Sequence, residues 1–279
     1  MLLIADSGST KTEWMLLEKG KLVKTIYTDG FNPYYYGENE IARMLNHDLL
    51  PHIQGNTISE ILYYGSGCST ETNCNIVTNA FQKVFTDIKS TIYHDLLGAA
   101  HALLGKEKGI ACILGTGSNS CAYDGDAIIE NVPSLGFMLA DEGSGTYIGK
   151  LFLTAYLYDE VPKSVANDFF ETYKLTTSEI LDILYRKERP GKFLSTLSSF
   201  VGKHKDKPFC RQLIATAFDD FIRVQLSKYT DYEKLPIGFT GSVAFHFSDI
   251  LSERLARHNL TIHKVCATPT KGLVAFHTR

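Results

Sequence analysis

Short apolar runs alternate with turns rich in Gly, Ser and Thr in both halves of the chain. Each half begins with a pattern that predicts a three-stranded antiparallel meander, at residues 2–5, 13–17 and 22–27 and again at 110–114, 120–123 and 127–130. Helices alternating with single buried strands follow each meander. This repeat predicts two similar α/β domains facing each other. We place the first at 1–105, with 268–279 returning to it, and the second at 106–267 with a helical insertion.

Apolar residues at helical spacing predict the longer helices. A helix over 40–50 is expected to stop before Pro51, because proline cannot continue a helical ladder. Residues 163–228 are expected to be wholly helical. Within them, Thr176 and Glu179 fit a capping box at the start of a helix that reaches Arg186. A single helix is predicted over 244–258.

Composition and charge exclude several classes of protein. The chain has 279 residues, of which 44% are hydrophobic and 21% charged, within the globular range. A net charge of -3 gives no basic footprint for nucleic acid. No apolar run approaches the roughly 18 residues of a membrane span, and the N-terminal run is too short for a signal peptide. The six cysteines form no CxxC pair, so we expect a reduced, cytoplasmic protein.

A carboxylate and a Gly-rich turn stand at the ends of two successive predicted strands. The strand over 91–93 ends at His94-Asp95, and a short helix over 97–104 follows. The next strand, 110–114, runs directly into Gly115-Thr116-Gly117-Ser118-Asn119. Ligands of open α/β sheets collect at the carboxyl ends of the strands. This stretch is therefore expected to form half of an active site.

Three Gly-containing turns are candidates for holding phosphate or nucleotide. Glycine lets the backbone approach a ligand closely and direct N–H groups at it. One turn is Gly8-Ser9-Thr10, the second is Gly115–Ser118, and the third, Gly241-Ser242, opens a helix. Each alone is more often a simple hairpin, but three together on two domains favour nucleotide binding. Neither a Walker A sequence nor a GxGxxG fingerprint is present.

Four polar side chains are candidates for the chemistry. Asp6 at the first strand tip suits water-mediated Mg²⁺ coordination. Asp95 suits a general base that takes the proton of an attacking hydroxyl; the less favoured alternative is that it only N-caps the helix from Leu96. Asn32 and Asp141 can hydrogen-bond a polyhydroxylated substrate; the alternative for Asp141 is a favourable charge before a helix. The neighbours His94 and His101 make no ligand set, so we interpret both as structural.

Five segments carry a resemblance to a known family. In order along almost the whole chain they are Asp6–Thr12, Asp95 with Gly98-Ala99, Gly115–Asn119, Asp141–Ser144 and Gly241–Val243. They resemble the N-acetylglucosamine kinase branch of the BadF/BadG/BcrA/BcrD ATPase family, within the actin/Hsp70/sugar-kinase superfold. The resemblance implies two RNase H-like (actin-like ATPase) domains that close over ATP and sugar in an interdomain cleft.

The resemblance also implies roles for individual residues. Asp95 corresponds to the family's catalytic base, and Mg²⁺ is expected at Asp6 through water. The expected ATP-binding residues are Ser9, Thr10, Lys11, Gly115, Thr116, Gly117, Gly241 and Ser242. The expected sugar-binding residues are Asn32, Asn119, Asp141 and Gly145. A homodimer is implied as well.

These observations favour an ATP-dependent kinase acting on the 6-hydroxyl of N-acetylglucosamine or a related amino sugar. Where the family commonly has Gly-Gly-Trp-Gly, this chain has Ser134–Phe137, which leaves the choice of amino sugar open. Two alternatives remain. One is an ATPase that activates a radical dehydratase, which needs cysteines for an Fe–S cluster that Cys68 and Cys74 do not convincingly supply. The other is a non-catalytic sugar sensor, which retention of Asp95 argues against.

Overall fold

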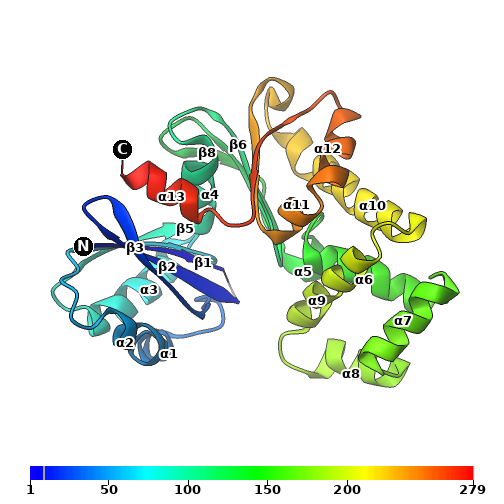
Figure 1. Cartoon of the computed structure of the whole chain (residues 1–279), viewed down its shortest axis with the longest axis horizontal. Helices are drawn as coiled ribbons and strands as arrows, with labels where there is room; N and C mark the ends of the chain where they lie inside the picture. The colour runs from blue at the N-terminus through cyan, green and yellow to red at the C-terminus, as the bar shows by residue number, and fades with distance from the viewer. Residues whose placement is uncertain (9, 279) are drawn as a thin grey trace. The chain divides into compact units, whose positions relative to one another are not determined.

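The computed structural model describes residues 1–8 and 10–278. They form two compact units, seen in Figure 1. The first unit comprises Met1–Glu107, Gly125–Ala127 and Pro269–Arg279, and the second comprises Lys108–Asp124 and Ile128–Thr268. Each contains a five-stranded mixed sheet with helices packed against it. The predicted α/β class with two RNase H-like domains is confirmed.

The sheet of the first unit has the strand order β3-β2-β1-β4-β5. Its strands are β1 (Leu2–Ser7), β2 (Lys11–Glu18), β3 (Lys21–Asp29), β4 (Glu60–Gly65) and β5 (Lys89–His94). β1 runs antiparallel to β2 but parallel to β4, and β4 runs parallel to β5. The carboxyl ends of β1, β4 and β5 therefore meet at one edge of the sheet, where Asp6 pairs with Tyr64 and Gly65 with His94.

Both faces of this sheet are buried, because successive side chains of a strand point to opposite faces. Leu3, Trp14 and Tyr63 pack under α1 (Glu38–Met44) and α3 (Glu71–Val84). Ile4 and Met15 pack on the other face, under α4 (Asp95–Leu104) and α13 (Thr270–His277). Figure 1 shows α13 beside α4. The C-terminal helix thus supports the helix that begins at Asp95.

The helix predicted to stop before Pro51 continues past it, so that prediction was wrong. α1 runs into a π-helical turn, Leu45–Leu49, and then into α2 (Leu50–Ile53). Pro51 is the second residue of α2. The first residues of a helix need no N–H partner, so proline is tolerated there. The π-turn restarts the hydrogen-bond ladder and removes the conflict that the sequence pattern suggested.

The sheet of the second unit has the order β10-β9-β6-β7-β8. Its strands are β6 (Gly109–Leu114), β7 (Ser118–Tyr123), β8 (Ile128–Asn131), β9 (Ile237–Thr240) and β10 (Ile262–Cys266). β6 pairs antiparallel with β7 and parallel with β9, as β1 does with β2 and β4. The internal repeat inferred from the sequence pattern is therefore present in the strand topology.

Helices make up most of the remainder of the second unit. They are α5 (Gly136–Leu139), α6 (Gly145–Leu157), α7 (Lys163–Tyr173), α8 (Thr177–Arg186), α9 (Pro190–Lys203), α10 (Pro208–Val224), α11 (Ser242–His246) and α12 (Ser248–Ala256), with 3-10 turns at Leu226–Lys228 and Tyr232–Lys234. The predicted capping box is confirmed, with Thr176 N–H donating to Glu179 Oε2 at 2.8 Å. The single helix predicted over 244–258 is instead two, divided at Phe247.

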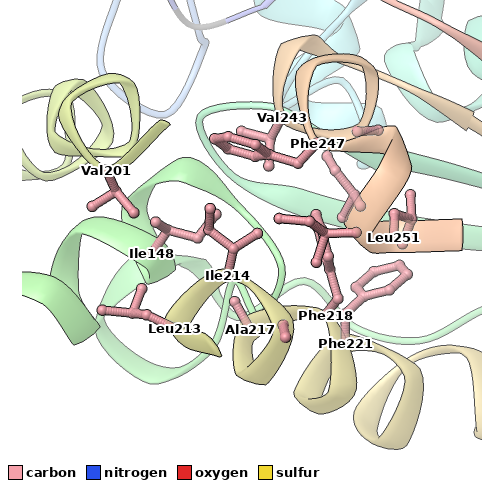
Figure 2. Packing of buried hydrophobic residues seen from close by; sticks show 14 of the residues in the cluster. Ile148, Val201, Leu213, Ile214, Ala217, Phe218, Phe221, Val243, Phe247 and Leu251 are labelled. Carbon is pink, nitrogen blue, oxygen red and sulfur yellow. The ribbon is translucent and has the colours of Figure 1, made fainter. Parts of the chain in front are cut away.

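The core of the second unit is built around the apolar face of α10, which is formed by its buried residues. In Figure 2 this face lies against Ile148 of α6, Val201 of α9 and Leu251 of α12. The residues of α10 labelled there are Leu213, Ile214, Ala217, Phe218 and Phe221. Among helices in the described part of the chain, none is long and apolar enough to cross a membrane.

Candidate active site

Two carboxylates lie at the carboxyl edge of the first sheet. Asp6 is the last residue but one of β1. Asp95 is the first residue of α4, which directly follows β5. Burial, and to a smaller extent the nearby charge of Asp95, raise the pKa of the Asp6 carboxyl to about 7. Burial also raises the pKa of Asp95. The structure therefore brings the predicted metal residue and the predicted base into electrostatic contact.

The Asp6 carboxylate fits a Mg²⁺ ion bound largely through water. A cation would relieve the repulsion between Asp6 and Asp95 that the raised pKa reports. Residues 1–8 and 10–278 contain no cluster of three or more His, Cys, Asp or Glu side chains that could hold a metal. A site with few protein ligands is typical of Mg²⁺, which keeps several waters and uses substrate phosphates.

The raised pKa of Asp6 predicts an inverse dependence of stability on pH. The folded carboxyl keeps its proton up to about pH 7, whereas the unfolded one loses it near its ordinary pKa of 3.8. The folded state therefore binds more protons in this range, and raising the pH through it destabilises the fold. We expect Asp6→Asn to be about 2 kcal/mol more stable than the natural protein at pH 8 in EDTA, a figure reduced for partial solvent exposure.

Urea unfolding at pH 5 and pH 8 tests this expectation. The stability advantage of Asp6→Asn should be smaller at pH 5 than at pH 8, because the loss in the natural protein grows as the pH rises from about 4 to about 7. Asp29→Asn is a matched control, because Asp29 is an exposed carboxylate on β3 of the same sheet. Equal pH slopes for all three proteins would contradict the interpretation of Asp6.

Asp95 is held by its immediate neighbours. His94 Nε2 lies 3.1 Å from Asp95 Oδ1, and the two side chains are 19% and 22% exposed. The His94 ring and the backbone N–H groups of Asp95 and Leu96 favour the charged carboxylate and partly offset the effect of burial on its pKa. The N-cap position of α4 is His94, so Asp95 is the first helical residue and not the N-cap.

The two histidines near Asp95 have different surroundings. His94 was interpreted as structural from the sequence, yet its ring faces the candidate base. Adjacency along the chain was the only signal for this contact. His101 is buried, with Nδ1 3.1 Å from the Tyr64 hydroxyl, and the same hydroxyl lies 2.8 Å from His277 Nε2. This buried network joins β4, α4 and α13.

The first Gly-containing turn connects β1 and β2. Gly8 N–H donates to Lys11 O at 3.0 Å and closes it. Ser9 lies outside the described residues, and Thr10 is exposed. Lys11 Nζ lies 3.8 Å from the centre of the Tyr27 ring, a cation–π contact that orients this candidate phosphate ligand.

Asn32 lies in the loop after β3 and is half-buried. Its Oδ1 accepts the Tyr34 N–H at 3.0 Å, which shapes the loop. Gly67 packs directly on this side chain: a Cβ there would lie 2.3 Å from Asn32 Oδ1, at a φ of +80°. The position of Asn32 is thus fixed by its own loop and by the turn after β4.

The second Gly-containing turn connects β6 and β7 and rests on the start of α6. Gly145 N–H donates to Gly115 O at 2.8 Å, and Thr146 N–H donates to Thr116 O at 3.1 Å. A Cβ on Gly115 would meet nothing within 4 Å, so this side of the turn is open. Gly145 itself is buried and uses its N–H to hold the turn.

Asp141 connects the same turn to α6 by hydrogen bonds. It is 8% exposed, and its Oδ1 accepts the Ser118 N–H at 3.2 Å. Thr146 donates its hydroxyl to Oδ2 at 3.5 Å. Burial raises the pKa of this carboxyl, and its backbone φ of +67° is unusual for a residue other than glycine. Strained backbone held by several contacts is often found at functional sites.

The third turn packs against the second. Gly241 has a φ of +112°, and a Cβ there would lie 2.3 Å from Leu114 O and 3.1 Å from Gly115 N. Gly241 N–H donates to Cys266 O at 3.1 Å, which ties the turn to β10. Ser242, the first residue of α11, is exposed. Within the second unit, the structure therefore brings together two of the three turns that the sequence singled out.

Several solved structures share this fold, and one of them is also similar in sequence. A Porphyromonas gingivalis protein superposes with a TM-score of 0.96 and 39% identity, over 100% of this chain and 99% of that one. A Chromobacterium violaceum protein superposes with a TM-score of 0.74 and 16% identity, over 99% and 98%. Both carry the name "putative N-acetylglucosamine kinase". A ROK family glucokinase from Streptomyces griseus, solved with glucose and AMPPNP, gives 0.54 and 13% over 99% and 97%.

No family model and no curated protein matches the sequence. The fold and the 39% identity to the P. gingivalis protein nevertheless define the class, which is that of ATP-dependent sugar kinases built from actin-like ATPase domains. This identity extends over essentially the full length of both chains and therefore also identifies the family within that class. The chain belongs to the N-acetylglucosamine kinase-like family.

Proposed function

We propose that the protein transfers the γ-phosphoryl group of ATP to the 6-hydroxyl of N-acetylglucosamine or a closely related amino sugar. The observation that carries this proposal is the Asp95 carboxylate, which lies against His94 at the start of α4 and is near enough to Asp6 for its charge to raise the pKa of Asp6. The 39% identity to a protein named as a putative N-acetylglucosamine kinase supports the choice of sugar.

Asp95 acts as the general base in this proposal. Phosphoryl transfer requires little covalent chemistry from the protein, so positioning and charge stabilisation dominate. The base accepts the proton of the attacking hydroxyl, and burial that raises its pKa makes it a better acceptor. His94 lies against one carboxylate oxygen and helps to fix the orientation of the base.

Residues of both units bind the nucleotide in this proposal. Backbone N–H groups and hydroxyls of two turns bind phosphate oxygens, with Lys11 adding a positive charge. The residues involved are Ser9, Thr10, Lys11, Gly115, Thr116, Gly117, Gly241 and Ser242. Asp6 holds Mg²⁺ through water, and the ion, when bound, neutralises charge on the phosphates. Asn32, Asn119, Asp141 and Gly145 bind the sugar.

The contacts of the cysteines favour a kinase over an activating ATPase. Cluster ligation requires thiolates, but Cys68 is 3% exposed and burial raises the pKa of its thiol. The thiol of Cys74 donates to Cys68 O at 3.4 Å. All six cysteines are free, which fits a reducing compartment, and we place the protein in the cytoplasm as a homodimer.

ADP release across a panel of sugars tests the proposed function. The panel contains N-acetylglucosamine, glucosamine, N-acetylmuramic acid, N-acetylmannosamine and glucose, each with ATP and Mg²⁺. We expect turnover with one amino sugar and little without sugar. ATP hydrolysis that is independent of sugar would support the activator, and binding without turnover would support the sensor.

A further inference from the structure

The side-chain amide of Asn119 has a fixed orientation. Its Oδ1 accepts the backbone N–H of Ser120 at 2.9 Å. A backbone N–H can only donate, so the side-chain atom that faces it must be the oxygen. The same oxygen accepts Asn131 Nδ2 at 3.1 Å. The carbonyl end of Asn119 is therefore occupied by two donors of the protein.

Asn131 is the residue that completes this arrangement. It is the last residue of β8, the strand next to β7 in the sheet. Its Nδ2 donates to Ser120 O at 2.7 Å and contacts Val132 O at 3.1 Å. Three oxygen atoms thus surround this nitrogen, and the reversed amide would place an oxygen against all of them. The orientation of Asn131 is as firmly determined as that of Asn119.

Polar contacts also hold Ser120 and Val132, the residues that directly follow the two asparagines. The Ser120 hydroxyl lies 2.7 Å from Gln225 Oε1 and 2.8 Å from the Tyr229 hydroxyl. The Val132 N–H donates to the same Tyr229 oxygen at 3.2 Å. Networks whose members are all satisfied hold side chains rigidly. Strands β7 and β8 are thereby anchored to the chain segment after α10.

We propose that Asn131 is a positioning residue that locks Asn119 so that it presents only its Nδ2 hydrogens to the sugar. Asn119 then acts as a hydrogen-bond donor and selects an acceptor oxygen of the substrate. This inference rests on the proposed function for the role of Asn119 in sugar binding. The geometry of the lock stands independently of that role, since it is formed by residues of one unit alone.

Kinetics of Asn131→Leu test the positioning role. Leucine keeps the approximate size but removes the hydrogen bonds, so Asn119 can rotate. We expect the KM for the sugar to rise about tenfold, as for one lost hydrogen bond, with kcat and the KM for ATP within about twofold. Asn167→Leu on α7 is the control, because Asn167 is exposed. An unchanged sugar KM in Asn131→Leu would overturn the proposal.

Two variants of Asn119 test the polarity of the contact. Asn119→Asp keeps the acceptor oxygen but replaces the NH₂ donor by a second acceptor oxygen, whereas Asn119→Ala removes both groups. We expect Asn119→Asp to raise the sugar KM at least as much as Asn119→Ala, since a carboxylate would repel an acceptor. A sugar KM in Asn119→Asp near that of the natural protein would show that Asn119 accepts a hydrogen bond, and would overturn the assignment.

A spectroscopic readout tests the lock without any turnover. The side-chain NH₂ signal of Asn131, identified by its absence in Asn131→Leu, should be protected from solvent exchange relative to that of Asn167. The Asn119 signal should shift in Asn131→Leu. If no sugar is turned over, the proposed function fails, while protection of Asn131 still supports the lock. An unprotected Asn131 signal overturns the lock whatever the activity.

Discussion

Asp95→Asn is expected to lower sugar-dependent turnover by about 10³-fold, within the range for loss of a general base. An amide cannot accept the proton of the attacking hydroxyl, although it has nearly the shape of the carboxylate. The KM values for ATP and sugar should change little, because the substitution leaves the turns of both units intact. Steady-state kinetics with saturating ATP and the preferred amino sugar measure the effect.

The same variant should keep its fold. Removal of the Asp95 charge relieves the repulsion that raises the pKa of Asp6, so the melting temperature should stay level or rise. Loss of activity with a normal melting temperature therefore separates catalysis from stability. A variant that retained more than about a tenth of the turnover would show that Asp95 is not the base.

Gly30→Ala is expected to have the second largest effect, because it displaces the turn after β1. A Cβ on Gly30 would lie 2.1 Å from Gly8 O and 2.5 Å from Lys11 N, both backbone atoms of the turn. Backbone cannot give way as a flexible side chain can. We expect the KM for ATP to rise at least about tenfold and the fold to lose about 2 kcal/mol, as for overpacking.

A matched Gly→Ala change distinguishes this clash from a general effect of glycine replacement. Gly37 lies in the segment that follows, and a Cβ there would meet only Glu40 Oε2, at an ordinary 3.7 Å. Gly37→Ala should therefore leave the KM for ATP unchanged. If both variants behaved alike in ATP kinetics and urea unfolding, the close packing of Gly30 would not explain the result.

The strands of both sheets could be predicted because apolar runs bounded by turns specify them directly. Two helix boundaries could not be predicted from the spacing of apolar residues. The apolar pattern continues across both the π-helical turn before Pro51 and the division at Phe247, so it does not reveal either of them. The capping box at Thr176 was predictable because it is formed by residues three apart.

Only some residues of the candidate site could be predicted from the sequence. Asp6 and Asp95 could be singled out because each ends a predicted strand, and the glycines because they interrupt apolar runs. Asn131 could not, since its contact with Asn119 depends on the register of β7 against β8. That register shifts at Ala122/Tyr123, an irregularity that the sequence pattern does not reveal.

The ratio of phosphosugar to ADP is the most direct test of the account. The purified protein would be incubated with ATP, Mg²⁺ and N-acetylglucosamine, and the products quantified by phosphorus NMR. The proposed kinase yields one sugar 6-phosphate for each ADP, with little inorganic phosphate. ADP accompanied by an equal amount of inorganic phosphate, with no sugar phosphate from any amino sugar of the panel, would contradict it.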